Sequence, residues 1–196
     1  MGFERNLGRL RETGRKLVLP VERIKWVITE ELWNQKKEID TVIDVGAGTL
    51  YWSKWLSQYA KKTYAVDIVY EKSRLIKNGK IVLCNDIRET MESVKNANTL
   101  VWACDVLHHL DKDISEEIIR QSMENYHFIV IKDINACHKL GNFLNRLHDR
   151  ILNGEKIRDI DPYELLQLLQ KHGFKTRFFE MRKLWYPHFM IVAERQ

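Results

Sequence analysis

Residues 41–53 read T-V-I-D-V-G-A-G-T-L-Y-W-S, and the fold prediction for this chain rests on them. Residues 42–45 are a short, mostly apolar run that carries one carboxylate, Asp44, which is typical of a buried parallel strand. Gly46 and Gly48 follow at once, and a residue without a Cβ lets the backbone turn sharply and approach a ligand closely. After the glycines the apolar residues recur at helical spacing. A strand, a glycine-rich turn and a helix in this order predict a site for a nucleotide-type cofactor.

The details of this turn separate two classes of cofactor. A dinucleotide fingerprint, G-x-G-x-x-G, needs a third glycine where Tyr51 stands, and Tyr51 would crowd a pyrophosphate. Asp44, just before the glycines, also suits a cation better than a phosphate. The stretch instead resembles the first motif of the class I S-adenosylmethionine-dependent methyltransferases, D/E-x-G-x-G-x-G. That motif stands here as residues 44–50, with Leu50 in place of its last glycine.

The resemblance implies an α/β fold with a Rossmann-like, doubly wound, seven-stranded and mostly parallel sheet that ends in a C-terminal antiparallel hairpin. The element order agrees with it, because short apolar runs alternate with helical patterns from Thr41 onward. The predicted strands span residues 42–45, 63–67, 80–84, 98–103, 126–131, 174–181 and 186–193. Capping boxes at residues 113–116 and 161–164 predict the starts of two helices, and an apolar stripe predicts another over residues 140–151.

Length and patterning predict a single domain over residues 1–196, with an N-terminal helical cap segment, 1–38, and a cofactor-binding core, 39–196. The cap helix begins at Pro20, and one apolar face is expected to hold Ile24, Val27, Ile28, Leu32, Trp26 and Trp33. In the family such a segment often covers the mouth of the site, whereas the alternative is a helix that merely packs on the sheet. The basic stretch 5–19 is either a separate lid helix or a loose segment.

Composition sets limits on location and partners. No apolar run approaches the roughly 18 residues that span a bilayer, and no signal peptide is recognisable. The three cysteines lack a C-x-x-C pair, which favours a reducing cytoplasm, and neither they nor the histidines have metal-ligand spacing, so no metal site is predicted. The net charge of +5 is compatible with an anionic substrate, a membrane surface or nucleic acid, but a solubilising surface explains it more simply.

Asp67, at the end of the second predicted strand, is expected beside the glycine turn, because it follows Asp44 by about one strand–helix–strand unit. A carboxylate there can accept hydrogen bonds from both hydroxyls of a ribose. Because S-adenosylmethionine and NAD both contain a ribose, Asp67 does not distinguish between them. Asp86 can accept a hydrogen bond from an adenine amino group while Ile87 covers a ring face, and Asp86 can equally cap the next helix.

The resemblance implies that the chain binds S-adenosyl-L-methionine and releases S-adenosyl-L-homocysteine. It assigns the cofactor to residues near the ends of four predicted strands: Asp44, Gly46, Ala47, Gly48, Asp67, Ile68, Asp86, Ile87 and Cys104.

The segment after the fourth predicted strand, D-V-L-H-H-L at residues 105–110, resembles a motif of small-molecule methyltransferases. The chain has neither the D/N-P-P-Y/F/W signature of methylation at exocyclic amines of bases nor the Pro-Cys pair of cytosine-C5 methylation. His108 and His109 are the candidate catalytic residues, because an imidazole exchanges a proton near neutral pH. The alternative is that one packs beneath the loop and the other only orients substrate or is exposed.

The predicted function is therefore methyl transfer from S-adenosylmethionine to a small-molecule acceptor. An RNA or protein methyltransferase is the first alternative, supported by the basic balance of the chain, so nucleic acid is a possible but not favoured partner. A non-catalytic S-adenosylmethionine-binding protein is the second, supported by Leu50 in place of glycine. The acceptor and the oligomeric state do not follow from the sequence.

Overall fold

The computed structural model describes residues 20–70, 74–75, 79–135, 137, 158–183 and 186–196. The predicted helix 140–151 and the basic stretch 5–19 lie outside these residues. The proposed division into a cap, 1–38, and a core, 39–196, therefore stays a prediction.

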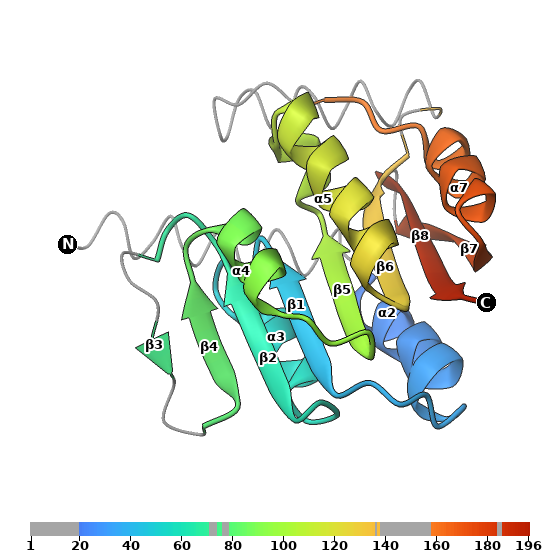
Figure 1. Cartoon of the computed structure of the whole chain (residues 1–196). Coiled ribbons are helices and arrows are strands. Elements are labelled where there is room, and N and C mark those ends of the chain that lie inside the picture. The colour runs from blue at the N-terminus through green and yellow to red at the C-terminus, as the bar shows by residue number, and fades with distance from the viewer. Residues whose placement is uncertain (1–19, 71–73, 76–78, 136, 138–157, 184–185) are drawn as a thin grey trace, which may run out of the picture.

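The described chain forms one eight-stranded sheet with the order β3-β4-β2-β1-β5-β6-β8-β7 (Figure 1). Its strands are β1 (Thr41–Val45), β2 (Lys62–Val66), β3 (Arg74–Leu75), β4 (Ile81–Cys84), β5 (Thr99–Cys104), β6 (Phe128–Ile134), β7 (Phe174–Lys183) and β8 (Tyr186–Arg195). The neighbouring strands β4, β2, β1, β5 and β6 are all parallel to one another. β8 is antiparallel to β6, and β7 is antiparallel to β8. All seven predicted strands are present, and the predicted fold class is confirmed. The two-residue β3, antiparallel to β4, is an addition.

Helices cover both faces of this sheet. They are α2 (Val21–Ile28) with the π-helical turn η1 (Thr29–Trp33), α3 (Tyr51–Leu56), α4 (Ile87–Ser93), the 3₁₀ turn η2 (Leu107–His109), α5 (Lys112–Asn125) and α7 (Pro162–Lys171). In Figure 1, α4, α5 and α7 lie in front of the sheet, and α2 and α3 lie behind it. The parallel strands point their carboxyl ends toward the top of that view. The strand order reverses between β1 and β5, which is where ligands bind in open α/β sheets.

Each face of the sheet has its own apolar core, because successive side chains of a strand point to opposite faces. Val101 and Ala103 of β5 join the core under α4, α5 and α7, and Leu100 and Trp102 join the core under α2 and α3. A strand that is buried on both faces has no alternating pattern, which is why these strands are near-continuous apolar runs in the sequence.

The helix starts agree only partly with the predicted capping boxes. Asp161 caps α7 as predicted, since its side chain accepts hydrogen bonds from the backbone N–H groups of Tyr163 (2.8 Å) and Glu164 (3.3 Å). The prediction for α5 is wrong at its start, because the helix begins at Lys112 with Asp111 as N-cap. Asp113 therefore lies inside the first turn instead of capping it.

The helix α2 packs on the sheet through part of the predicted face. Ile24, Val27 and Ile28 are buried among side chains of the sheet, but Trp26 is 63% exposed, so its predicted place on that face is wrong. At 100° per residue, Trp26 lies about 200° from Ile24 and on the opposite side of the helix. Trp33 packs against the same core as predicted, and it also stacks on Tyr59, just beyond α3, with ring centroids 4.8 Å apart.

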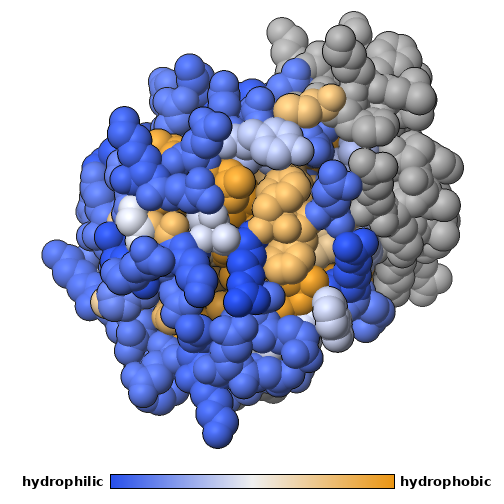
Figure 2. Space-filling model, turned by 90° about the vertical axis from the view of Figure 1, so that its right-hand side faces the viewer, coloured by the Kyte–Doolittle hydropathy of each residue, from blue (hydrophilic) through white to orange (hydrophobic). Residues whose placement is uncertain are grey.

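β7 forms the edge of the sheet beside α7, and its residues Phe178 and Phe179 are only partly buried. Figure 2 shows that face of the molecule, where apolar residues gather at the centre and hydrophilic residues surround them. Among the residues that the structure describes, no helix is long and apolar enough to cross a lipid bilayer.

Candidate active site

The glycine turn after β1 touches the loop after β5. Gly46 and Gly48 both have left-handed backbones, with φ of +69° and +46°. A Cβ built on Gly46 would lie 2.3 Å from Cγ2 of Val106, so no side chain fits there without movement of the β5 loop. A Cβ on Gly48 would meet only the Asp67 carboxylate, at an ordinary 3.9 Å, and the Gly46 carbonyl at 4.0 Å. Gly46 thus permits the close approach of the two loops at the switch point of the sheet.

Leu50 replaces the glycine of the resembling motif but keeps a left-handed backbone, with φ of +65°, as the residue before α3. Its N–H donates to the carbonyl of Ala47 over 2.8 Å, and its side chain packs on a small cluster that includes Ala65 and Leu83. A non-glycine residue in this conformation costs on the order of 1 kcal/mol, and side-chain packing can offset that amount. The turn therefore closes without the last glycine.

The carboxylate of Asp44 lies inside the protein. Only 1% of Asp44 is exposed, and the Ser53 hydroxyl of α3 donates a hydrogen bond to it. The predicted cofactor role of Asp44 can thus be only indirect in this arrangement. The hydrogen bond between Ser53 and Asp44 holds α3 against β1, and these two elements flank the glycine turn.

Asp67 joins the loops after β1 and β2. Its Oδ2 accepts a hydrogen bond from the Gly48 N–H (2.7 Å), and its Oδ1 accepts one from the Val69 N–H (3.1 Å). The Tyr70 hydroxyl donates to the Gly48 carbonyl over 2.8 Å. Burial, and after it the nearby negative charge of Asp67, raises the pKa of Tyr70, so the phenol stays a donor at neutral pH. Asp67 thus holds the glycine turn in place.

Apolar side chains stand exposed next to this carboxylate. Ile68 is 91% exposed and Val69 is 66% exposed, which is unusual for such residues beside an ordered turn. On the next loop, Asp86 is exposed and caps α4 through the Glu89 N–H (3.0 Å), in agreement with the capping alternative, and Ile87 is half-buried. The carboxyl ends of β2 and β4 therefore carry an acid and an apolar residue each.

The candidate histidines have different surroundings. His108 is buried, and its Nδ1 is hydrogen-bonded to Asp133 at the end of β6. Asp133 is fully buried and also accepts from the N–H groups of Leu107 (3.1 Å) and Ile134 (2.8 Å). His109 is exposed, and its ring lies 3.9 Å from that of His108, centroid to centroid. The pair Asp133–His108 thus anchors the turn that presents His109.

Cys104, at the end of β5, is buried in the core under α2 and α3, where its side chain packs among aromatic residues such as Trp102. Its thiol is 3.8 Å from Oδ2 of Asp105. The predicted cofactor contact of Cys104 can therefore involve its backbone but not its side chain.

A second polar cluster at the same edge was missed by the sequence analysis. Lys132 of β6 is fully buried, and its ammonium bonds to Asp105 and to Nδ1 of His188 (2.9 Å). Burial alone would raise the pKa of Asp105, but Lys132 and then His188 hold it well below its ordinary value. The signal was present in the sequence, because Lys132 and Asp133 are adjacent charges at the end of an apolar strand. Within the described residues, no group of three or more His, Cys, Asp or Glu side chains is placed to hold a metal ion.

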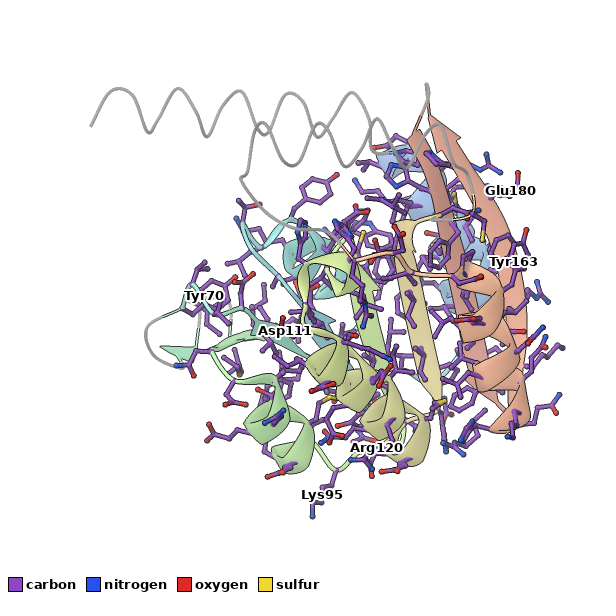
Figure 3. All side chains as sticks on the ribbon, turned by 90° about the horizontal axis from the view of Figure 1, so that it is seen from above. Tyr70, Lys95, Asp111, Arg120, Tyr163 and Glu180 are labelled. Carbon is purple, nitrogen blue, oxygen red and sulfur yellow. The ribbon has the colours of Figure 1, made fainter. Side chains whose placement is uncertain are left out.

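Figure 3 looks onto the carboxyl edge that carries these groups. Tyr70 and Asp111, both labelled there, mark the connections after β2 and after η2. The edge thus has one part around Asp67, over β1, β2 and β4, and a second part around His109 and Asp105, over β5, β6 and β8.

Comparison with known proteins identifies the family of this chain. A family model described as a methyltransferase domain matches residues 21–177. No match was found among curated protein sequences. At the level of structure, the chain is similar to an S-adenosylmethionine-dependent methyltransferase from Archaeoglobus fulgidus, with a TM-score of 0.67 and 17% identity over 95% of this chain and 99% of the other.

Two further solved structures are similar. The magnesium protoporphyrin IX methyltransferase of Synechocystis PCC 6803, with bound S-adenosylhomocysteine, has a TM-score of 0.62 and 15% identity over 89% of this chain and 83% of its own. The methyltransferase domain of bacterial CtHen1-C has a TM-score of 0.60 and 16% identity over 89% and 95%. Such low identities establish the fold alone, whereas the family model matches most of the chain. The protein therefore belongs to the methyltransferase domain family, as the motif at residues 44–50 predicted.

Proposed function

We propose that this methyltransferase transfers a methyl group from S-adenosyl-L-methionine to a small-molecule acceptor. The observation that carries the cofactor part of the proposal is the turn held by Asp67, and the resemblance of residues 105–110 to a motif of small-molecule methyltransferases supports the acceptor class. The carboxylate fixes the backbone N–H of Gly48, and the exposed side chain of Ile68 stands directly beside it. These groups match the parts of the cofactor, a ribose with two hydroxyls and a flat adenine that needs an apolar cover.

The residues present fit this cofactor. Gly46 lets the glycine turn lie against Val106, and Gly48 leaves room for a ligand beside Asp67. We assign Asp67 to the ribose hydroxyls, Asp86 and Ile87 to the adenine, and Ile68 to the other face of the adenine. When bound, the cofactor supplies an electrophilic methyl group on a positively charged sulfur. The contribution of the protein is mainly to bring the nucleophile into line with that methyl group.

A proton must leave the acceptor when its nucleophilic atom starts protonated, and we assign this step to His109. His109 is exposed at the carboxyl edge, whereas His108 is buried and held by Asp133. His108 is thus a positioning residue, because its ring packs against the ring of His109. This arrangement keeps one imidazole accessible to an acceptor.

The variant His109→Gln is expected to lower kcat at least tenfold with any acceptor whose nucleophile starts protonated, because a positioned base contributes about 10²–10⁴-fold. It should also change the pH–rate profile, because the group that takes the proton from the acceptor is removed. The affinity for S-adenosylhomocysteine should stay the same. His172→Gln, at an exposed histidine just after α7, is the control. A pH–rate profile of His109→Gln that matches the wild type would contradict the assignment.

Asp67→Ala is expected to weaken S-adenosylhomocysteine binding at least tenfold in calorimetric titration. The variant removes the acceptor for the ribose and also releases the Gly48 N–H from its place. A hydrogen bond to a charged group contributes about 1.5–3 kcal/mol, and about 1.4 kcal/mol corresponds to a tenfold change. The control is Asp113→Ala, at an exposed position in the first turn of α5. Equal affinities of the two variants would remove Asp67 from the site.

The runner-up is an RNA methyltransferase, which the net charge of +5 supports. The solved structures similar to this chain include Hen1 proteins, one of them in an RNA repair complex, but that activity belongs to those proteins. Phosphate contacts make RNA affinity fall steeply with salt. Micromolar binding of a short RNA that weakens at least tenfold between about 50 and 200 mM salt would favour this alternative, and its absence favours the small molecule.

The proposal also covers the cellular compartment of the protein and the role of its N-terminal segment. The sequence has three cysteines and no C-x-x-C pair, which supports a reducing compartment such as the cytoplasm. Near the glycine turn, the ammonium of Lys25 in α2 lies 5.3 Å from the ring centroid of Tyr51. This contact supports a role for the N-terminal segment at the mouth of the site.

A further inference from the structure

The cluster of Asp105, Lys132 and His188 joins three strands at the carboxyl edge. Lys132 comes from the end of β6, His188 from the beginning of β8, and Asp105 directly follows β5. The Lys132 ammonium bonds to Oδ1 of Asp105 and to Nδ1 of His188, and the same Oδ1 is 3.8 Å from the His188 ring nitrogen. The ammonium therefore connects the imidazole to one oxygen of the carboxylate.

Stability alone does not account for this cluster. Lys132 is fully buried, and the cost of removing an ammonium and a carboxylate from water is several kcal/mol per ion. The attraction between them offsets that cost only partly, and apolar residues of similar size are often as good or better. Asp105 in addition has a left-handed backbone, with φ of +54°. Strain of this kind in a non-glycine residue is concentrated at functional sites.

Asp105 is the member of the cluster that reaches the surface. Its side chain is 19% exposed, against 0% for Lys132 and 5% for His188. Oδ1 faces the buried cation, while Oδ2 has the Cys104 thiol at 3.8 Å, a long contact with a weak donor. A carboxylate has about four acceptor positions on its two oxygens, so Asp105 keeps capacity for a further donor.

The position of Asp105 separates it from the residues assigned to the cofactor. Asp67 and Asp86 follow β2 and β4, on one side of β1, whereas Lys132 and His188 lie on β6 and β8, on the other side of β5. The cluster also lies in the loop region of His109, four residues along the chain from Asp105. Asp105 therefore lies on the same side of the switch point as His109, away from the residues assigned to the adenosine.

We propose that Asp105 is an acceptor-binding residue that takes a hydrogen bond from an N–H or O–H group next to the atom to be methylated. Lys132 and His188 are its positioning residues, because Lys132 holds Oδ1 from the interior and His188 in turn holds the Lys132 ammonium. The inference rests on the proposed function and names its substrate class, an acceptor with an amine or hydroxyl donor. If an acceptor has a carboxylate or phosphate next to the atom to be methylated, the negative charge of Asp105 repels that group. Such acceptors are therefore disfavoured.

The test uses the 196-residue chain saturated with S-adenosylhomocysteine and three small probes of one shape. Benzylamine and benzyl alcohol present donors, and benzoate presents an acceptor-only anion. In ¹⁵N NMR titrations, the two donors should shift the backbone amide signals of Asp105 and His188 saturably at millimolar concentration. Benzoate should be at least fivefold weaker. No saturable shift with any probe, or equal shifts with benzoate, would overturn the proposal without the need for a variant.

A variant then assigns the selectivity to the cluster. The double variant Asp105→Asn/Lys132→Met removes both charges together, so that neither is left buried alone. It should lose the preference for benzylamine over benzoate while S-adenosylhomocysteine binding stays within twofold. Asp111→Asn, at an exposed aspartate of the same edge, should keep the preference. A preference that persists in the double variant overturns the proposal, and so does a tenfold loss of S-adenosylhomocysteine affinity, which would place Asp105 in the cofactor site. A wild-type protein that does not bind S-adenosylhomocysteine would instead contradict the proposed function.

Discussion

Gly46→Ala is expected to lower the free energy of unfolding by about 2–5 kcal/mol, since a left-handed alanine costs about 1–2 kcal/mol and overpacking typically adds about 1–3. The added Cβ would lie 2.3 Å from Val106 Cγ2 and 2.8 Å from its Cβ, at a position with φ of +69°. The loop after β5 must then move away from the glycine turn. Urea unfolding followed by circular dichroism measures the loss of stability, and calorimetry should detect no S-adenosylhomocysteine binding at concentrations that saturate the wild type.

Gly173→Ala is the matched control for this variant. Gly173 also has a left-handed backbone, with φ of +81°, but an added Cβ would meet nothing within 4 Å. Its expected cost is about 1–2 kcal/mol from the backbone alone, with cofactor binding unchanged. If the two variants lose equal stability, the contact between Gly46 and Val106 does not hold the two loops together.

Asp133→Ala is expected to lower the free energy of unfolding by about 3 kcal/mol or more, because each of three buried donors that loses its acceptor costs about 1–3 kcal/mol. Three donors share this fully buried carboxylate, namely the N–H groups of Leu107 and Ile134 and the ring of His108. Alanine would leave them buried without an acceptor, and each such group is costly. Chemical denaturation at pH 7 measures the change.

Asp133→Asn serves as the comparison for Asp133→Ala, because its amide oxygen can still accept from the backbone while its NH₂ cannot. It should lose less stability than alanine and still loosen His108. Asp113→Ala on the exposed side of α5 should change stability by less than about 0.5 kcal/mol. A loss below about 1 kcal/mol in Asp133→Ala would mean that water or a shifted loop replaces the carboxylate.

The sheet was predictable from the sequence because its strands are buried on both faces. Near-continuous apolar runs such as residues 42–45 and 98–103 leave few alternatives to a parallel strand, and the glycine turn indicates that a helix comes after the first of them. Helix starts were harder. Asp161 was predicted correctly as the N-cap of α7, because proline at the next position fixes the first turn of the helix. At α5, Asp111 and Asp113 are both suitable N-caps, and the sequence pattern does not distinguish between them.

The site was predictable where it follows the chain locally and was missed where it depends on distant strands. Asp67 and Asp86 stand at strand ends, so the alternation of elements placed them. Lys132 and His188 meet only because β8 inserts antiparallel beside β6, which brings residues far apart in sequence together. Trp26 was misplaced for a different reason, since its aromatic character was given more weight than its position, about 200° from Ile24 around the helix.

The most direct test of the central claim is calorimetric titration of the wild-type protein with S-adenosylmethionine, S-adenosylhomocysteine and NAD. The account predicts saturable binding of both adenosyl ligands and no binding of NAD, because Tyr51 stands where a dinucleotide turn needs glycine. Binding of NAD as tight as that of S-adenosylhomocysteine, or no binding of either adenosyl ligand, would contradict it.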